Sequence, residues 1–199
     1  MRILPAAFFQ RPTLTVARDL IGKIFFRRLD DTLLSGRIVE VEAYHQSEEA
    51  AHTFRGRTAR NEVMFRAGGF LYVYFTYGMH HCMNVVTERE GVGAAVLIRA
   101  LEPCEGIPRM RENRGGVRRD RDLLGGPARL CQALALTRAH NGLPLDGVAV
   151  GLTDAPRVPD SAVLTTTRVG ISRGRELPWR FCLAASPWLS PGRPALPSH

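Results

Sequence analysis

The sequence predicts a single α+β domain with a mostly antiparallel β-sheet core, a protruding β-hairpin and surrounding helices. Short runs rich in β-branched and aromatic residues are joined by turn residues, which is typical of antiparallel strands. Two amphipathic segments are bounded by proline or glycine, which is typical of helices. No internal repeat, linker or change of composition divides residues 1–190, and only the Pro-rich end, residues 191–199, differs from the rest.

The first helix is expected over residues 12–21, where apolar side chains recur at helical spacing. Thr13 or Thr15 can cap its N-terminus, and Gly22 ends it. The segment 45–69 is polar and irregular, and it is too long for a passive connection in a compact domain, so we expect it to be functional.

The remaining short apolar runs read as strands. They are expected at residues 23–29, 33–44, 70–77, 80–87, 93–101, 147–151, 163–169 and 180–184. The first two meet at Asp30-Asp31, and Gly78 predicts a hairpin between the third and the fourth.

An arginine-rich segment follows the fifth predicted strand. IPRMRENRGGVRRDRDLLGG holds six arginines around Gly115-Gly116. Residues 109–122 are either a mobile loop near a polyanion or a simple solvated loop, and the sequence leaves both open. Pro127 then begins a second helix, which is expected to run towards Asn141-Gly142.

The 199 residues include 27 basic and 19 acidic side chains, a net charge of +8, and Lys23 is the single lysine. This excess favours a polyanionic partner, nucleic acid first and an anionic membrane second, although charge alone also allows a basic protein with neither. No apolar run could span a bilayer, and the start, MRILPAAFFQRP, does not resemble a secretory signal.

The four cysteines are far apart, so neither a zinc site nor any other metal site is expected. They are interpreted as small buried side chains of a reducing compartment, the cytoplasm. His80-His81-Cys82 is interpreted as structural, because neighbouring strand residues point to opposite faces.

The strand GRIVEVEAY, residues 36–44, carries two carboxylates on one face. Period two places Ile38, Glu40, Glu42 and Tyr44 together, opposite Val39, Val41 and Ala43. A solvated strand often has this pattern, but one glutamate could equally be a general base at a cleft. The periodicity does not choose between Glu40 and Glu42.

The run FLYVYFTYGMHHCMN, residues 70–84, places Tyr72, Tyr74 and Thr76 on one face, and Tyr77 directly precedes the turn glycine. Sheet packing accounts for some of these aromatic residues. With the basic charge, the pattern also indicates a pocket lining and a wedge that enters a base step of DNA.

Taken in order, GRIVEVEAY, AAHTFRGRTARNEVMF, LYVYFTYGMHHCMNVV, AVLIRALEP, GGPARLCQALAL, RVGIS and PWRFCLAASPWLS resemble the alkyladenine (3-methyladenine) DNA glycosylase family. The resemblance covers most of residues 12–190. It implies a monomeric base-excision repair enzyme, without cofactor or metal, that acts on damaged double-stranded DNA. It implies release of 3-methyladenine and hypoxanthine, with ethenoadenine as a further candidate.

The resemblance also implies roles for single residues. Glu42 matches the general base that activates water, and Arg99 matches a residue near that water and the sugar-phosphate. The everted base would be held by residues that match the family's pocket: Tyr44, His52, Tyr74, Asn84 and Val169. Tyr77 matches the side chain that fills the gap left by base flipping, and Met79 matches a neighbouring side chain that packs into the opposite DNA strand. No family role carries over to residues 109–122, and we expect Glu48 and Glu49 not to face the DNA.

Three functional hypotheses are compared. The first is a hydrolytic DNA glycosylase, which Glu42 favours, since a binding module needs no carboxylate in a DNA-facing pocket. The second is a catalytically silent module that binds damaged DNA. A carbohydrate hydrolase is disfavoured, because Glu40 and Glu42 neighbour each other on one strand rather than flank a cleft. Schiff-base chemistry needs an amine, and Lys23 lies outside every pocket motif, so a monofunctional enzyme is predicted.

Overall fold

The computed structural model describes residues 2–76 and 78–192. The helices within this part of the chain are α1 (Ala6–Phe9), α2 (Thr13–Leu20), α3 (Ile107–Asn113) and α4 (Pro127–Ala133), with short 3-10 helices at Glu62–Phe65, Asp120–Asp122, Arg138–His140 and Asp160–Ala162. The strands are β1 (Ile24–Leu29), β2 (Thr32–His45), β3 (Leu71–Thr76), β4 (His80–Val86), β5 (Ala94–Glu105), β6 (Val150–Thr153), β7 (Val163–Thr166) and β8 (Arg180–Leu183).

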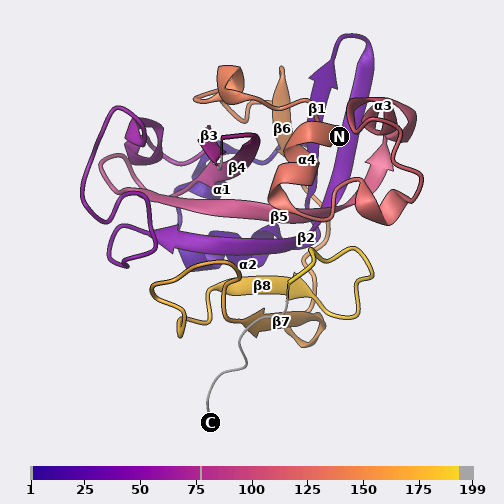
Figure 1. Cartoon of the computed structure of the whole chain (residues 1–199). Coiled ribbons are helices and arrows are strands. Elements are labelled where there is room, and N and C mark those ends of the chain that lie inside the picture. The colour runs from indigo at the N-terminus through magenta and orange to yellow at the C-terminus, as the bar shows by residue number, and fades with distance from the viewer. Residues whose placement is uncertain (1, 77, 193–199) are drawn as a thin grey trace.

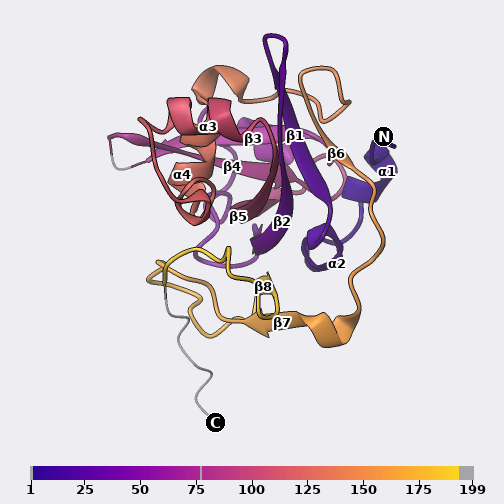
Figure 2. The same cartoon turned by 90° about the vertical axis from the view of Figure 1, so that its right-hand side faces the viewer.

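The strands form one curled antiparallel sheet in the order β3-β4-β5-β2-β1-β6 (Figure 1). Strand β2 is central. It pairs with β5 along one edge, and along the other edge its first half pairs with β1 and its second half with β8. Strand β7 pairs with β8, outside this order. The β3–β4 hairpin projects from the body of the domain (Figure 2). The predicted α+β class, with an antiparallel sheet and a protruding hairpin, is confirmed.

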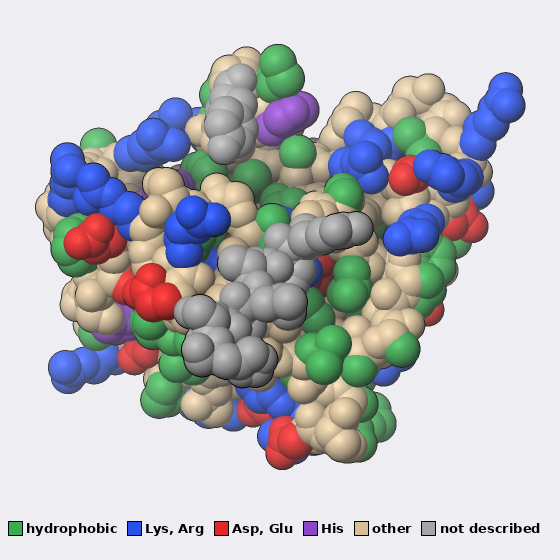
Figure 3. All heavy atoms as spheres, turned by 60° about the horizontal axis from the view of Figure 1, so that its bottom comes forward, with side chains coloured by type: hydrophobic (Ala, Val, Ile, Leu, Met, Phe, Trp, Pro, Cys, Tyr) green, Lys and Arg blue, Asp and Glu red, His purple; other side chains and the backbone are tan. Residues whose placement is uncertain are grey.

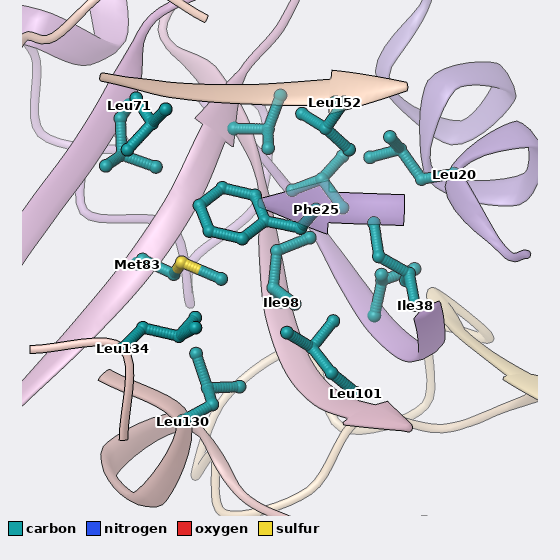
Figure 4. Close-up of a cluster of buried hydrophobic side chains, with 14 of the residues drawn as sticks. Leu20, Phe25, Ile38, Leu71, Met83, Ile98, Leu101, Leu130, Leu134 and Leu152 are labelled. Atoms are coloured by element: carbon teal, nitrogen blue, oxygen red, sulfur yellow. The ribbon is translucent and has the colours of Figure 1, made fainter. Parts of the chain in front are cut away.

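The core lies between the sheet and the helices α2 and α4. Leu20 of α2, Phe25 of β1, Ile98 of β5 and Leu130 of α4 meet there, each with 0% exposure (Figure 4). Burying one such side chain contributes about 1.5–3 kcal/mol, so this cluster holds the helices onto the sheet.

The predicted first helix is confirmed as α2, but its cap is not a threonine. Thr13 lies inside the helix, and the residue before it is Pro12, which offers no side-chain acceptor. The carboxylate of Glu88 accepts hydrogen bonds from Thr13 N at 2.7 Å and from Thr13 Oγ1 at 2.8 Å. A distant acidic side chain therefore satisfies the free N–H at this helix start.

The second predicted helix is much shorter than expected. Helix α4 ends at Ala133, and Ala135 takes a left-handed conformation with φ of 51°. The guanidinium of Arg27 donates to the carbonyl oxygens of Leu134 and Ala135. Because buried Leu134 and Leu136 continue into the core, the chain leaves the helix there, and Arg27 caps carbonyl oxygens that have no partner within the helix.

Strand β2 does not keep a strict alternation of faces. Its register against β5 shifts between Ile38 and Glu40 and again between Glu40 and Val41. Ile38 therefore packs in the same core as Val41 and Ala43, not on the face of the two glutamates as expected. An irregularity of this kind inserts a residue and reverses the alternation beyond it.

Several other predicted elements differ from the structure. Strand β5 runs four residues past 101, and β6 begins at Val150 rather than at 147. Residues 107–113 form the helix α3 instead of a loop. Cys82, Cys131 and Cys182 are buried as expected, whereas the expectation that every cysteine is buried is wrong at Cys104, which is exposed.

The arginine-rich segment is held by its own side chains. Arg111 donates to Val117 O at 2.8 Å and also to Arg118 O and to Asp120. Arg119 pairs with Asp122 at 2.7 Å. Of the two interpretations that the sequence left open, the structure favours a solvated, internally paired segment.

Candidate active site

Glu42 of β2 is fully buried, and three hydrogen-bond donors hold its carboxylate. Val169 N donates to Oε1 at 2.7 Å. Oε2 accepts from the Tyr44 hydroxyl at 2.8 Å and from Arg99 Nη1 at 3.2 Å. A carboxylate offers about four acceptor positions, so the donors among the described residues leave about one position unused.

Glu40 is also fully buried, and its carboxylate accepts four hydrogen bonds. Oε1 accepts from Arg99 Nε at 2.9 Å, from Arg180 Nε at 2.8 Å and from Ser190 Oγ at 2.8 Å. Oε2 accepts from Ser190 N at 2.6 Å. Three donors thus share Oε1, which has two lone pairs, and one donor binds Oε2.

Arg99 of β5 lies between the two glutamates. Its Nε faces Glu40, its Nη1 faces Glu42, and its Nη2 donates to Ser190 Oγ at 3.2 Å. Burial by itself lowers the pKa of Arg99, but the carboxylates of Glu42 and Glu40 outweigh burial and raise it. The guanidinium therefore remains a permanent cation inside the protein.

Tyr44 stays protonated at neutral pH. Its burial and the negative charge of Glu42 raise its pKa well above the usual value. The hydroxyl therefore keeps donating to Glu42. Arg168 lies over the Tyr44 ring at 4.7 Å from the ring centre, which fixes the aromatic plane.

A pocket of about 110 Å³ opens beside these residues. Its lining residues are Tyr44, Ala50, His52, Met64, Tyr72, Tyr74, Asn84 and Ile171. The rings of Tyr72 and Tyr74 stack with centres 5.6 Å apart, and His52 stands edge-on to Tyr74 at 4.5 Å. The pocket is therefore walled mainly by aromatic faces and edges.

His52 comes from the long segment that precedes β3. Its Nδ1 lies 3.2 Å from the Tyr72 hydroxyl, and its carbonyl oxygen accepts from Asn61 Nδ2 at 2.8 Å. Partial burial of the ring and the positive charge of Arg60 lower the pKa of His52. The imidazole is consequently neutral at pH 7.

Asn84 of β4 lies at the pocket wall, directly opposite Tyr72 in the β3–β4 ladder. Its Nδ2 donates to Tyr72 O at 3.2 Å, so the orientation of the amide is fixed. Only 5% of the residue is exposed. A buried, oriented amide of this kind can discriminate between bases by their hydrogen-bonding groups.

The tip of the β3–β4 hairpin carries Met79, which is 69% exposed. Such an apolar side chain on a projecting turn is unusual unless it meets a partner. Tyr77, for which the sequence predicts intercalation, lies outside the described residues.

A second hollow of about 210 Å³ adjoins the pocket and shares Tyr74 with it. Arg60 and Arg138 line it together with Val73, Phe75 and Asn141. Within residues 2–76 and 78–192, neither arginine has a carboxylate within salt-bridge distance. Figure 3 shows basic side chains scattered over one face, with acidic side chains beside several of them.

The acidic residues of the segment before the pocket are paired internally. Glu48 is buried and receives both terminal nitrogens of Arg168, at 2.7 and 2.9 Å. Glu49 lies 3.4 Å from Arg173 on the surface. Both negative charges are therefore offset by arginines of the segment that follows β7.

The structure thus brings Glu42, Arg99, Tyr44 and the backbone of Val169 to one point, with His52, Tyr74 and Asn84 at the adjoining pocket. The side chain of Val169 does not line the pocket, and Ile171 takes that place.

Sequence reasoning missed several participants. They are Ala50, Met64, Tyr72 and Ile171 at the pocket, Arg180 and Ser190 at the carboxylate of Glu40, and Arg168 over the Tyr44 ring. Tyr72 could have been found, because period two places it on the face of Tyr74. The pairing of Ser190 with Glu40 had no local signal.

Among the described residues, no group of three or more His, Cys, Asp or Glu side chains could hold a metal ion. Within the same ranges, no helix is long and apolar enough to cross a membrane.

A family model described as methylpurine-DNA glycosylase (MPG) matches residues 7–187. This covers most of the chain, including β2, β5 and the β3–β4 hairpin. The chain belongs to the methylpurine-DNA glycosylase family. It is therefore a DNA glycosylase of base-excision repair, as the sequence resemblance predicts.

Relatives extend over nearly the whole length. A protein of Chlorobium luteolum is 52% identical over 197 residues, 98% of this chain and 100% of its own length. Proteins of Carboxydothermus hydrogenoformans and Methanoculleus marisnigri are 48% and 47% identical, each covering 94% of this chain and 98% of their own. Each of the three carries the name "Putative 3-methyladenine DNA glycosylase".

Proposed function

We propose that this enzyme flips a damaged purine out of double-stranded DNA and hydrolyses its N-glycosidic bond with a water activated by Glu42. The substrate named for its relatives, 3-methyladenine, is the first candidate, followed by hypoxanthine and ethenoadenine. The enzyme acts as a monomer without metal or cofactor, in the cytoplasm, where DNA holds it at the nucleoid.

The observation that carries this proposal is the unequal use of the two buried carboxylates. Among the described residues, four donors bind Glu40, whereas three bind Glu42, and Glu42 Oε1 accepts from Val169 N alone. A general base needs a free lone pair for the proton of water. Glu42 also adjoins the aromatic pocket through Tyr44, which lines it.

The reaction moves one proton and exchanges one bond at the sugar. Glu42 accepts a proton from water while the water oxygen bonds to C1′ of the flipped nucleotide. The bond from C1′ to the base nitrogen breaks, and its electron pair leaves with the base. A 3-methylated adenine is cationic before cleavage and leaves as a neutral molecule, so no acid is needed for it.

The pocket chemistry suits a cationic base. The faces of Tyr44, Tyr72 and Tyr74 attract positive charge, and a neutral His52 does not repel it. Asn84 supplies an oriented amide at the pocket wall that disfavours the exocyclic amine of guanine. A base inside a duplex hides its glycosidic bond, so the nucleotide must be flipped to reach this pocket.

The DNA contacts follow from the surface around the pocket. By the family resemblance, Tyr77 would occupy the gap that the flipped base leaves, and exposed Met79 would pack into the opposite DNA strand. Arg60 and Arg138 line the neighbouring hollow, where their guanidinium groups suit a backbone phosphate. Phosphate contacts release counterions, so binding weakens as salt increases.

The single lysine is poorly placed for Schiff-base chemistry. Lys23 is only 6% exposed, and its Nζ donates to Asp154 at 2.8 Å and to Ala155 O. We therefore propose a monofunctional enzyme that leaves an intact abasic strand. Borohydride treatment during turnover should trap no protein–DNA adduct, and a trapped adduct would overturn monofunctionality.

The test of Glu42 is single-turnover excision from duplexes that contain 3-methyladenine or hypoxanthine. Glu42→Gln should keep its DNA affinity and lose about 100-fold or more in rate, because the general base is gone. Glu88→Gln is the matched control, since it makes the same chemical change in a carboxylate that caps α2. Near-normal excision by Glu42→Gln would remove Glu42 from its role.

The same assay separates the second candidate, a silent module that binds damaged DNA. Exposed Met79 on the projecting hairpin would serve such a module equally well. Tight binding by the wild-type protein without abasic product from either lesion would leave only that function.

A further inference from the structure

Glu40 is a buried carboxylate that the proposed reaction does not use. We propose that Glu40, together with Ser190, is a positioning residue that holds one edge of Arg99 and so keeps Glu42 a strong enough base to activate water. This inference rests on the proposed function of Glu42. It assigns Glu40 no contact with DNA or with the reacting atoms.

Glu40 is unsuited to proton transfer itself. Its Oε1 accepts from Arg99, Arg180 and the hydroxyl of Ser190, and its Oε2 accepts from the backbone N–H of Ser190. None of these three residues lines the aromatic pocket, whereas Glu42 accepts a hydrogen bond from the pocket residue Tyr44. A buried carboxylate that binds two arginines and a serine, and no pocket residue among those described, acts on its neighbours rather than on a ligand.

The first effect of Glu40 is to share the positive charge of Arg99 with Glu42. Arg99 Nε lies 2.9 Å from Glu40, whereas Nη1 lies 3.2 Å from Glu42, the longest of the three hydrogen bonds that Glu42 receives. A cation favours the charged form of a carboxylate and so weakens it as a base. By sharing the guanidinium, Glu40 limits this weakening at Glu42.

The second effect is on the segment that carries Val169. Ser190 and Arg180 are 150 and 140 residues away from Glu40 in the chain, and both bind its carboxylate. Arg180 also donates to Thr166 Oγ1 at 3.3 Å. The segment between β7 and β8 is thereby fixed against β2, and within it Val169 N donates to Glu42.

Other charged or titratable groups surround Glu42 as well, and they are the background for any pH effect. They are Tyr44 on β2, Tyr74 on β3, Arg99 on β5, Arg168 after β7, and Arg180 and Cys182 on β8. Glu40 is the only carboxylate besides Glu42 that, among the described residues, binds Arg99.

The experiment is the single-turnover rate of Glu40→Gln measured against pH on a 3-methyladenine duplex. The glutamine side chain would keep an acceptor for Arg99 but lose the charge, so Arg99 should turn more fully to Glu42. The rate at the optimum should fall about tenfold, as for the loss of one charged hydrogen bond. On the acidic side of the pH–rate profile, the midpoint of the rise in rate should move to lower pH. DNA affinity should stay within about twofold.

Ser190→Ala is the second variant, because it removes the hydroxyl that joins Glu40 to Arg99 while both charges remain. It should slow excision less than Glu40→Gln does, with the acid limb moved in the same direction. Glu88→Gln should leave rate and pH profile unchanged. If Glu40→Gln does not fold, Ser190→Ala decides the question by the same measurement.

A merely structural Glu40 would lower the melting temperature without moving the acid limb, and that result overturns the inference. An unchanged rate and pH profile in both variants overturns it too. Absence of excision by the wild-type enzyme would instead contradict the proposed function, so the two failures are distinguishable.

Discussion

Two arginine-rich regions of this molecule use their charges differently. Around the pocket, Arg99, Arg168 and Arg180 are buried and each binds a buried glutamate. In residues 107–122 the pairs lie at the surface, as between Arg119, whose side chain is 81% exposed, and Asp122. Buried charges must be paired, whereas exposed pairs contribute little, so removing a partner should destabilise the first region more.

The surface arginines differ as well. Arg55, Arg57 and Arg60 are exposed, and the stretch 52–60 contains no acidic residue. Residues 107–122 contain six arginines and three acidic residues. Three of these arginines form ion pairs with the acidic residues of the same stretch. Arginines without acidic residues in the same stretch keep their positive charge available for phosphate. We therefore expect DNA to lie along residues 52–60 rather than along residues 107–122.

The largest expected effect is the loss of stability caused by Glu48→Gln. The side chain of Arg168 is fully buried, and its two terminal nitrogens bind Glu48. Leaving this cation without a charged partner should cost about 3–5 kcal/mol of unfolding free energy, measured by urea denaturation. Asp122→Asn, which breaks the exposed pairs, should cost below about 1 kcal/mol. Equal losses would erase the contrast between the regions.

The next largest effect concerns DNA affinity. Replacing Arg55, Arg57 and Arg60 by glutamine should weaken binding and reduce the slope of log affinity against log salt by about 1 for each phosphate that is no longer bound. The matched triple change at Arg109, Arg111 and Arg119 should leave that slope nearly unchanged. A larger decrease of slope in the second triple variant would assign the DNA to the arginine-rich segment instead.

Arg111→Met tests the stabilising role of the arginine-rich segment. The substitution removes hydrogen bonds to Val117 O, Arg118 O and Asp120. Unfolding free energy should fall by about 1–2 kcal/mol, because carbonyl acceptors lose a charged donor. DNA affinity measured by fluorescence anisotropy should stay within about twofold, and a larger loss would mean that Arg111 faces DNA.

The smallest expected effect is on the titration of His52. Partial burial and the charge of Arg60 both lower the pKa of His52. Arg60→Met removes the second cause only, so the pKa should rise but stay below its usual value. Imidazole resonances followed by NMR against pH measure this directly, and an unmoved midpoint would place Arg60 too far away to act.

Local pattern predicted much of this fold. The hairpin between β3 and β4, the β1–β2 turn at Asp30-Asp31 and the buried stripe of α2 follow from residue type, period and turn chemistry. The prediction failed where distant groups intervened. Glu88 caps α2, and Arg27 ends α4, and both act from remote positions in the chain.

For the site, the sequence by itself determined which residue types are present and placed Glu40, Glu42 and Tyr44 on one strand face, because adjacent positions alternate. The ordered motifs also determined the family. Only the tertiary structure decided how the two glutamates differ, since that difference depends on donors from Arg99, Val169, Arg180 and Ser190. These donors meet β2 through long-range strand pairing, which no local pattern specifies, and burial then makes each hydrogen bond obligatory.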